Sequence, residues 1–331
     1  MVVAAFAAAV IVLTISQLAG KSFHTPEVTY SGNGVLSAYD LRLGQSIALV
    51  RGLDQLPVAW SWSPDGTQLA YVLLDDRGGY HLSVWSPQSR RAREIVRDLP
   101  VGSPPQWSPD GDTIAVVDRN QDICLYPSAG GERRCLNVQP ASQPVWSPDG
   151  ESIAFLPRLH PGGLSRIDVD SGGVTPVFTG GQGLNHPRWS PDGTQIAFSY
   201  VPDTDGLRHI FVVLADGGDA VALTGGDSIQ DQPVWSPDGR SIVYIDDPVK
   251  AGLQADVVVV TIETGEVTAV TSHPMNDADP RWSPDGRWLA FVSDRFGGQP
   301  HLQIVPADGR SAEPLGEQGI GMTLYAYAWR P

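Results

Sequence analysis

The sequence lacks the short motifs that mark the common catalytic sites. It contains no Gly-x-Ser-x-Gly elbow for a serine nucleophile, no His-Glu-x-x-His for a zinc peptidase and no Cys-x-x-Cys-His for haem attachment. These absences exclude the most easily recognised hydrolases, metallopeptidases and c-type cytochromes. We therefore expect a protein that is not an enzyme.

Cysteine is almost absent, and the chain has only Cys124 and Cys135. They lie four residues before Ser128 and four residues after Gly131, so a hairpin that turns over residues 128–131 brings them face to face. In an oxidising compartment such a pair favours a disulfide. A two-residue turn makes them a hydrogen-bonded pair, whose geometry suits a bridge less well, and two free thiols are the alternative. With no second cysteine pair or matching histidine, a metal site is not expected.

Long apolar runs are also missing, apart from one at the start of the chain. Residues 2–15 are apolar except for Thr14, whereas a membrane span needs about 20 residues. The run has the length of a signal-peptide core, and Leu18-Ala19-Gly20 offers small residues for cleavage. An uncleaved anchor over residues 2–20 is the alternative. In either case we expect residues 1–20 to direct export, residues 21–26 to form a linker, and the remainder to be extracytoplasmic, either periplasmic or on the cell surface.

Positive charge is scarce in this chain. There are 22 Lys and Arg residues against 37 Asp and Glu residues, which gives a net charge of −15 and a pI near 4.7. A nucleic-acid partner requires a basic patch or stripe, so we expect no nucleic acid among the partners.

A repeated pentapeptide is the dominant feature that the chain does have. Trp-Ser-Pro-Asp-Gly occurs six times, and a degenerate copy, Trp329-Arg330-Pro331, follows. Pro fixes φ near the value required at the first central position of a type I turn, and Asp suits the second central position. Gly takes the following position, where φ is often positive. Each Trp ends one strand and offers an apolar face to a neighbouring sheet. The six copies begin at Trp62, Trp107, Trp146, Trp189, Trp235 and Trp282.

The spacing of the copies predicts the architecture. A repeat of about 40–45 residues made of short strands is typical of a β-propeller with one copy per blade. Seven inner strands end at a Trp, but only six are followed by three more strands. Strands expected at 27–30, 35–41 and 46–50 can complete a blade with a C-terminal strand at 323–329 and so remove the open edge. We predict an all-β, seven-bladed propeller of four-stranded blades over residues 27–331; six blades with an irregular N-terminal extension is the alternative.

The full pattern Pro-x-Trp-Ser-Pro-Asp-Gly-x-x-Ile-Ala-Phe, present at residues 187–198, resembles the TolB-type repeat, a relative of the WD40 repeat. The resemblance covers about residues 26–331 and implies a TolB-like β-propeller. TolB itself carries an α/β domain before a six-bladed propeller, whereas only about two dozen residues precede the first expected strand here. The resemblance therefore implies the fold and not a place in the Tol system.

Polar residues shortly before several of the tryptophans are the candidate site. Residues at the same position of the repeat lie at corresponding places around the channel in different blades. These side chains are therefore expected to line one channel mouth. Three carboxylates there offer hard oxygen ligands, so Ca²⁺ is the one cofactor considered. A peptide end is another occupant, and a solvated polar rim is the plain alternative. The residues are Asn185, His186, Asp231, Asp277 and Asp279, of which Asp231, Asp277 and Asp279 are the candidate metal ligands.

These patterns together predict an exported, membrane-tethered propeller that binds a protein partner or a small ligand. Such a module serves as a scaffold or as an accessory subunit of a membrane complex. The alternative is a glycan hydrolase or lyase with an acid or a metal at the channel mouth.

Overall fold

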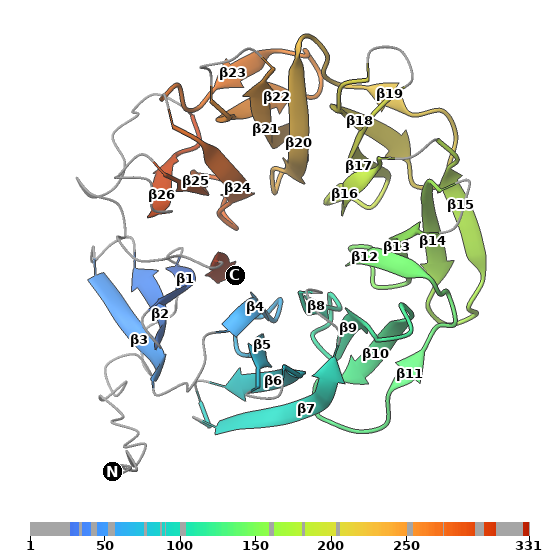
Figure 1. The fold of residues 1–331 in the computed structure, drawn as a ribbon, viewed down its shortest axis with the longest axis vertical. Coiled ribbons are helices and arrows are strands. Elements are labelled where there is room, and N and C mark those ends of the chain that lie inside the picture. Colours follow the sequence, from blue (N-terminus) through green and yellow to red (C-terminus); the bar gives the residue numbers. More distant parts are fainter. Residues whose placement is uncertain are drawn as a thin grey trace.

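The structure is a computed structural model, and its strands form a ring around a central axis, where the sequence predicts the channel (Figure 1). Residues 1–26, where we expect an export segment and a linker, lie outside the described residues. No helix within the described part of the chain is long and apolar enough to cross a membrane. For the strands within residues 27–51 and for residues 327–330, the structure describes only the backbone. The described residues are 27–32, 35–40, 45–51, 57–75, 78–86, 88–89, 91–99, 104–158, 162–180, 183–202, 206–249, 254–273, 275–294, 301–308 and 327–330.

Six sheets are built from strands that follow one another in the chain. In each, the first strand lies beside the channel and the last lies farthest out (Figure 1). The first three are β4 (Pro57–Trp62), β5 (Leu69–Leu74), β6 (Tyr80–Ser86) and β7 (Arg91–Leu99); β8 (Gln106–Trp107), β9 (Thr113–Val117), β10 (Ile123–Pro127) and β11 (Arg134–Cys135); and β12 (Ala141–Trp146), β13 (Ser152–Pro157), β14 (Leu164–Asp168) and β15 (Val174–Phe178).

The next three sheets repeat the arrangement, and the last of them has three described strands. They are β16 (Asn185–Trp189), β17 (Gln195–Tyr200), β18 (His209–Leu214) and β19 (Val221–Ala222); β20 (Ser228–Trp235), β21 (Ser241–Pro248), β22 (Asp256–Thr261) and β23 (Val267–Ala269); and β24 (Asp277–Trp282), β25 (Trp288–Ser293) and β26 (His301–Pro306). The all-β propeller expected from the repeat is confirmed.

A further sheet joins the two ends of the chain. Its order is β27 (Tyr327–Arg330), β1 (Glu27–Gly32), β2 (Val35–Asp40) and β3 (Gln45–Arg51). Strands β27 and β1 are antiparallel, with Val28 opposite Trp329. Strand β27 also contacts β4, the inner strand of the neighbouring sheet. The predicted pairing of the C-terminal strand with the N-terminal strands is therefore confirmed, and the described strand begins at Tyr327.

Each copy of the pentapeptide forms the same hydrogen-bonded turn, as the copy after Trp235 illustrates. Ser236 Oγ donates to Asp238 Oδ1 at 2.6 Å, and the same Asp238 oxygen accepts the Arg240 N–H at 3.1 Å. The Gly239 N–H donates to the Ser236 carbonyl at 2.9 Å, with a φ of 71° at Gly239 that favours glycine. The hydrogen bond from the preceding serine lowers the pKa of the turn carboxylate in Asp110, Asp149, Asp192 and Asp238. These carboxylates are turn formers, as the sequence predicts.

Neighbouring sheets are joined by two contacts that recur along the ring. The Trp235 Nε1–H donates to the Arg188 carbonyl at 3.1 Å, and the Trp282 Nε1–H donates to the Val234 carbonyl at 3.1 Å. A Cβ added to Gly286 would lie 3.6 Å from Cδ of Pro237, and the glycines of the four turns before it pack on the proline of the preceding turn in the same way. These are Gly111, Gly150, Gly193 and Gly239. The repeat residues thus fasten one blade to the next as well as shaping the turn. The same indole bond is made by Trp107, Trp146 and Trp189.

The apolar core lies between sheets rather than within one. In one cluster, Trp235, Ile242 and Tyr244 pack against Ala197 and Ile210 of the preceding sheet. The small residue in the middle of each second strand is fully buried, which lets adjacent sheets approach closely as expected. These residues are Ala70, Ala115, Ala154, Ala197, Val243 and Ala290.

The repeat tryptophans are not equally buried. Trp235 is buried, with 7% of its surface exposed, and Trp62, Trp107 and Trp146 are similarly buried. Trp189, in contrast, is half-buried. We expect Trp235→Ala to lower the free energy of unfolding by about 3–5 kcal/mol, the usual cost of truncating a buried aromatic side chain. Trp189→Ala should cost less, because less apolar surface is lost from the core. Urea titrations of both variants test this order, and equal midpoint shifts would contradict it.

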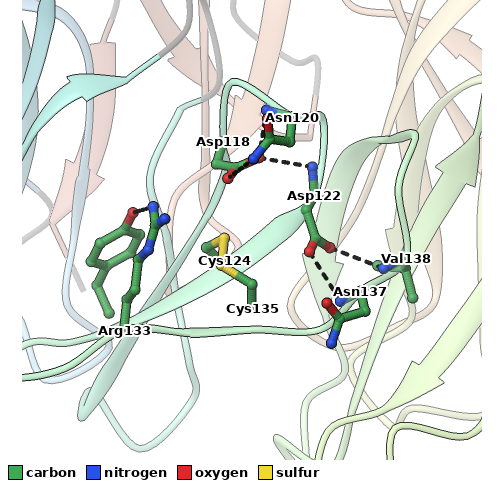
Figure 2. The surroundings of a disulfide bond; sticks show 9 residues. Asp118, Asn120, Asp122, Cys124, Arg133, Cys135, Asn137 and Val138 are labelled. Carbon is green, nitrogen blue, oxygen red and sulfur yellow. Dashed lines mark hydrogen bonds between the residues drawn. A yellow bond between two sulfur atoms is a disulfide. The ribbon is translucent and has the colours of Figure 1, made fainter.

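The two cysteines form a disulfide on the outer hairpin (Figure 2). Cys124 on β10 lies opposite Cys135 on β11, and their sulfur atoms are bonded. The Asp122 carboxylate accepts the backbone N–H groups of Asn137 and Val138 at 3.0 and 2.9 Å, just beyond β11. Asp118 lies near the sulfur atoms, but sulfurs bonded to each other supply no thiolate for a metal ion. The bridge thus holds a very short outer strand, and the predicted disulfide is confirmed.

Candidate functional site

The candidate site lies where the inner strands begin. The pentapeptide turns follow these strands, so their starts lie on the opposite face of the ring. In β12, β16, β20 and β24 the pairing register slips by one residue just before the Pro-x-Trp sequence. The residue at each slip has a positive φ: 51° at Gln143, 54° at His186, 59° at Gln232 and 51° at Asp279. Non-glycine residues adopt this conformation at a cost of about 1–3 kcal/mol, so the surrounding contacts must hold them there.

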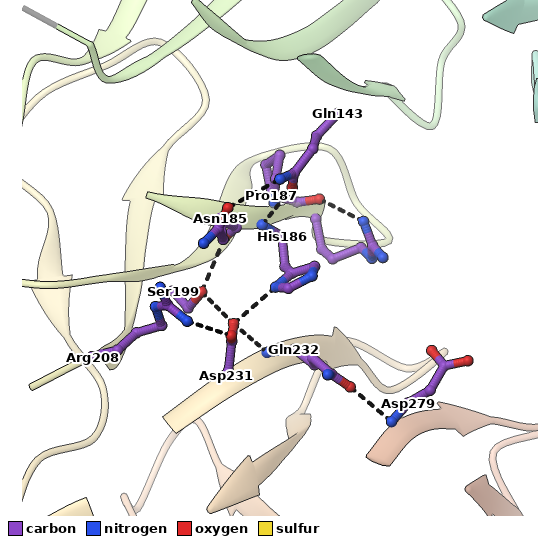
Figure 3. A network of polar contacts seen from close by, with 10 residues as sticks. Gln143, Asn185, His186, Pro187, Ser199, Arg208, Asp231, Gln232 and Asp279 are labelled. Carbon is purple, nitrogen blue, oxygen red and sulfur yellow. Dashed lines mark hydrogen bonds and ion pairs between the residues drawn. The ribbon is translucent and has the colours of Figure 1, made fainter. Parts of the chain in front are cut away.

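Side chains of one blade accept the N–H groups of these bulges in the next blade. Gln143 Oε1 accepts the His186 N–H at 2.7 Å, and Gln232 Oε1 accepts the Asp279 N–H at 2.7 Å. Between these two contacts, Asp231 Oδ1 accepts the Gln232 N–H at 2.8 Å and lies 2.8 Å from His186 Nδ1. The result is a continuous chain of polar contacts across four blades at the channel mouth (Figure 3).

Asp231 is the centre of this network. Ser199 Oγ donates to its Oδ1 at 2.6 Å, and Arg208 Nη1 donates to its Oδ2 at 2.7 Å. Burial acts to raise the pKa of Asp231, but hydrogen bonds from His186 and Ser199 and the charge of His186 outweigh it and hold that pKa well below its usual range. Asp231 is therefore an ionised acceptor and not a proton donor at neutral pH.

The ionised carboxylate sets the orientation of His186. A carboxylate only accepts hydrogen bonds, so the ring nitrogen facing it, Nδ1, carries a proton. Whenever the ring carries a single proton, Nε2 is the acceptor. The His186 side chain is 36% exposed, compared with 19% for Asp231. The pair presents a positioned imidazole to the mouth.

A second group of charges follows on β16 and β24. Arg281 Nη2 lies 3.1 Å from Asp279 Oδ2. Arg188, at the equivalent position of β16, donates from Nη1 to the Pro187 carbonyl at 3.0 Å. Burial and the charge of Arg281 lower the pKa of Arg188 to about 10, against the opposing effect of Asp279, so Arg188 stays charged at neutral pH.

The structure brings together most of the residues predicted to line the mouth. His186 and Asp231 are in direct contact, and the Asn185 amide lies 3.1 Å from Gln143 Nε2. The Asp279 N–H joins the same network through Gln232.

Asp277 lies elsewhere, because it is one position further from its Trp than Asp231 is from Trp235. It is 2% exposed, and its N–H donates to the Ala255 carbonyl at 2.9 Å. Asp231, Asp277 and Asp279 do not form a group whose ligand atoms meet within 4.8 Å in the described part of the chain. The Asp231 oxygens already accept four hydrogen bonds, so the arrangement does not resemble a Ca²⁺ site.

Several members of the network were missed at the sequence level. Gln143 and Gln232 share the position of His186 and Asp279 before the proline, which is a signal that the sequence contains. Arg188 and Arg281 were visible as two Pro-Arg-Trp sequences. Arg208 lies in a connection with no repeat pattern, so no signal marks it.

Comparisons with known structures agree with this architecture. TolB from Acinetobacter baumannii superposes with a TM-score of 0.57 at 22% identity, covering 92% of this chain and 81% of that one. This chain has a TolB-like β-propeller fold. An oligogalacturonate lyase in complex with manganese superposes with a TM-score of 0.67 at 16% identity, covering 86% of this chain and 82% of that chain. At such identities the likeness concerns the fold alone.

Sequence matches are confined to part of the propeller. The family described as the dipeptidyl peptidase IV N-terminal region matches residues 236–295. The uncharacterised peptidase YuxL of Bacillus subtilis strain 168 is 34% identical over 80 residues, which is 24% of this chain and 12% of that protein. YidR of Escherichia coli K12 is 31% identical over 81 residues, 24% of this chain and 20% of that protein. The propeller therefore spans only a small share of the curated relatives that it matches.

Proposed function

We propose that this TolB-like propeller is a binding module whose ligand or partner engages the channel mouth. The residues that form this mouth are those of the polar network: Gln143, His186, Asp231, Gln232 and Asp279. The observation that carries the proposal is the strained bulge in four successive blades, two of which are held by a glutamine side chain of the neighbouring blade. Non-glycine residues with positive φ concentrate at sites where function fixes the backbone. A rim that merely met water would not require a conformation of this kind four times.

A comparison of two faces tests the proposal. The double variant His186→Ala/Asp231→Asn alters the mouth, and Arg240→Gln alters an exposed turn residue on the opposite face. Tagged forms of each protein are cross-linked in intact cells, solubilised in detergent and recovered, and partners are identified by mass spectrometry. We expect partners recovered by the wild type to be retained by Arg240→Gln and lost by the mouth variant. Identical partner sets for both variants would reject the mouth as the binding surface.

We also propose that the module works outside the cytoplasm, tethered or secreted through residues 1–20. The disulfide supports this, because such bonds persist in oxidising compartments. Trapping thiols with an alkylating reagent in living cells should leave Cys124 and Cys135 unmodified. Full alkylation of both cysteines without a reductant would contradict export.

We further propose that the sheet β27-β1-β2-β3 acts as a seventh blade that closes the ring. The contact of β27 with both β1 and β4 supports this, because it places the C-terminal strand between the first described strand and the next blade. A ring closed by strands from both ends has no exposed inner edge at that point.

A second candidate function rests on the His186–Asp231 pair. A histidine oriented by a carboxylate through Nδ1 is the arrangement of a general base. In a lyase, such a base removes a proton next to a sugar carboxylate while the glycosidic oxygen leaves and a double bond forms. Ser199 touches Asp231 and is fully buried, so it does not serve as a nucleophile activated by His186.

An absorbance assay separates the two functions. If the propeller is a lyase, oligogalacturonate or another uronate oligomer gains ultraviolet absorbance as the double bond forms, and His186→Ala abolishes the gain. No absorbance change, or a change of equal rate in His186→Ala, would leave the binding function alone.

A further inference from the structure

Three arginines converge where two neighbouring blades meet at the outer edge of the ring. Strand β7 is the outermost strand of one blade, and β11 is that of the next (Figure 1). Arg93 on β7 donates from Nη2 to the Ser128 carbonyl in the turn before β11. Arg91 lies two residues earlier, so its side chain is on the same side of β7. Arg133 enters from the other blade, where its Nη1 donates to Tyr126 Oη at 3.2 Å.

These three arginines, which we call the basic junction, are exposed and contact neutral acceptors. The two hydrogen bonds above go to a carbonyl and a hydroxyl, and within the part of the chain that the structure describes none of the three forms an ion pair. The two acids on β7 have other partners, because Glu94 pairs with Arg97 and Asp98 lies 3.7 Å from Arg119.

The residues beside Arg133 do not cancel this charge. Glu132 and Arg134 flank it and carry opposite charges. The basic junction therefore presents a local excess of positive charge to solvent.

The same hairpin carries the opposite charge farther round the ring. The turns that join β14 to β15, β18 to β19 and β22 to β23 each contain two acidic side chains and no basic one. The whole chain has a net charge of −15, so the basic junction is a local exception to its composition. The acidic residues of these hairpins are Asp168, Asp170, Asp216, Asp219, Glu263 and Glu266.

The basic junction lies on the face of the ring at which the described chain begins. The Ser128 N–H donates to the Asp112 carbonyl at 2.8 Å, which places this hairpin beside a pentapeptide turn. Glu27, the first described residue, lies opposite Arg330 and directly after the level of Trp329, so β1 starts on the same face. Because β27 contacts β4, the sheet that contains β1 is next to the blade that contains β7.

This position brings the basic junction near the proposed tether. The six residues 21–26 between the apolar segment and β1 span at most about 20 Å when extended. A membrane that holds residues 1–20 would therefore lie close to this face of the ring.

The chemistry of the basic junction favours a lipid surface over a protein. None of the exposed large apolar side chains that the structure describes lies on β7, on β11 or in the turn before β11. Protein interfaces place aromatic or apolar anchors at their centre, whereas a surface of anionic head groups attracts arginines through charge.

We propose that Arg91, Arg93 and Arg133 dock the propeller on the anionic phosphodiester head groups of the membrane beside its N-terminal segment. The proposal rests on the tether proposed above. Contact at the basic junction, together with repulsion of the acidic hairpins, inclines the ring so that one edge approaches the lipid. The channel mouth is on the opposite face, so it stays away from the membrane and open to its partner.

Energy transfer to lipid measures this docking in the full chain. The protein is reconstituted in phosphatidylcholine vesicles, with or without phosphatidylglycerol, that carry an acceptor dye on their head groups. Ala129→Cys, in the exposed turn that Arg93 contacts, and Thr264→Cys, in the exposed turn before β23, each take a donor dye, while the native cysteines are bonded. We expect phosphatidylglycerol to raise energy transfer at position 129 and not at position 264. Raising the salt from about 0.05 M to about 0.5 M should remove this gain.

Variants then locate the surface. Arg91→Gln/Arg93→Gln/Arg133→Gln should lose the gain, because each arginine near an anionic surface strengthens association about fivefold. The corresponding triple lysine variant should keep it, since a lipid surface responds to charge more than to the planar guanidinium. Arg240→Gln, beside a pentapeptide turn of the same face, is the control and should behave as the wild type does. Circular dichroism verifies that each variant is folded.

Several results would overturn the proposal: no effect of phosphatidylglycerol, an equal gain at both labels, or a full gain in the triple glutamine variant. If phosphatidylglycerol has no effect while the glutamine variant loses a cross-linked protein that the lysine variant recovers, the basic junction binds an acidic protein and membrane docking is rejected.

The N-terminus of the protein isolated from cells separates this proposal from those it accompanies. If residues 1–20 have been removed, the tether is rejected, and the mature protein is sedimented with the same vesicles. Binding that needs phosphatidylglycerol and is lost in the glutamine variant then supports the basic junction, and no binding rejects it. Loss of partners by His186→Ala/Asp231→Asn concerns the opposite face and tests the mouth alone.

Discussion

A chain shortened by its last nine residues, 323–331, should lose more than about 10 °C of melting temperature or fail to unfold in a single cooperative transition. The deletion removes β27 and with it the pairing to β1 and the contact with β4. In a repeat fold each unit is stabilised by its neighbours, so an open ring loses two interfaces at once. For a domain of this size about 1 kcal/mol corresponds to roughly 2–4 °C, so the expected shift is equivalent to several kcal/mol.

A point substitution tests the same contact without shortening the chain. Ala328→Pro removes a backbone N–H within β27 and should destabilise the protein strongly, whereas Ala328→Ser keeps the N–H and should have little effect. Removal of Pro331 alone is a second control, because that residue follows β27. If Ala328→Pro and the nine-residue deletion both melt like the wild type, closure by the terminal strands does not stabilise the ring.

Replacing Asp231 with Asn should lower the free energy of unfolding by about 2–4 kcal/mol at neutral pH. The substitution leaves Arg208 without its ion pair and weakens the bonds to His186 and Ser199, and losing one partner of a largely buried charged pair is costly. Asp219→Asn, at an exposed position on the same blade as Ser199, is the matched control and should change stability little. Denaturant titration at pH 7 measures the difference, and equal effects of the two substitutions would show that the network contributes little to stability.

The same substitution should change the response to acid. The folded state holds the pKa of Asp231 below that of an unfolded aspartate, which is about 3.9. The stability gained from the ionised group is therefore complete above that value and is lost as pH falls through the folded pKa. Between pH about 4 and 2 the wild type should lose stability more steeply than Asp231→Asn. Parallel curves for the two proteins would contradict this assignment.

The repeat made most of the fold predictable. A turn of Ser236, Asp238 and Gly239 depends on residues that are adjacent in sequence, so its geometry follows from local chemistry. The pairing of β27 with β1 was predictable for a different reason, because an inner strand without outer strands implied a partner elsewhere in the chain. The unequal burial of Trp189 and Trp235 was not predictable, since exposure depends on the side chains that the adjacent blades supply.

The site was less accessible to sequence reasoning because it depends on single-residue register. Counting back from the tryptophan predicted that Asp231 and Asp277 lie together. Asp231 is four residues before its tryptophan, however, and Asp277 is five residues before its own. A strand alternates its side chains between two faces, so this difference of one position separates them. One became the centre of the mouth network and the other was buried near Ala255. The bulge before each proline adds a further residue, so alternation alone does not give the direction of the side chains. Arg208 reaches Asp231 from a connecting segment, and its position depends on tertiary packing.

The junctions between blades bear on how such a chain changes over evolutionary time. An indole N–H on a backbone carbonyl and a glycine on a proline are the same at successive junctions, so they do not distinguish one neighbour from another. These two contacts therefore do not set the order of the blades, which depends on covalent connectivity and on contacts that differ between junctions, such as that of His186 with Asp231. Excision or duplication of one unit at equivalent positions, such as Trp146 and Trp189, would recreate both contacts at the new junction.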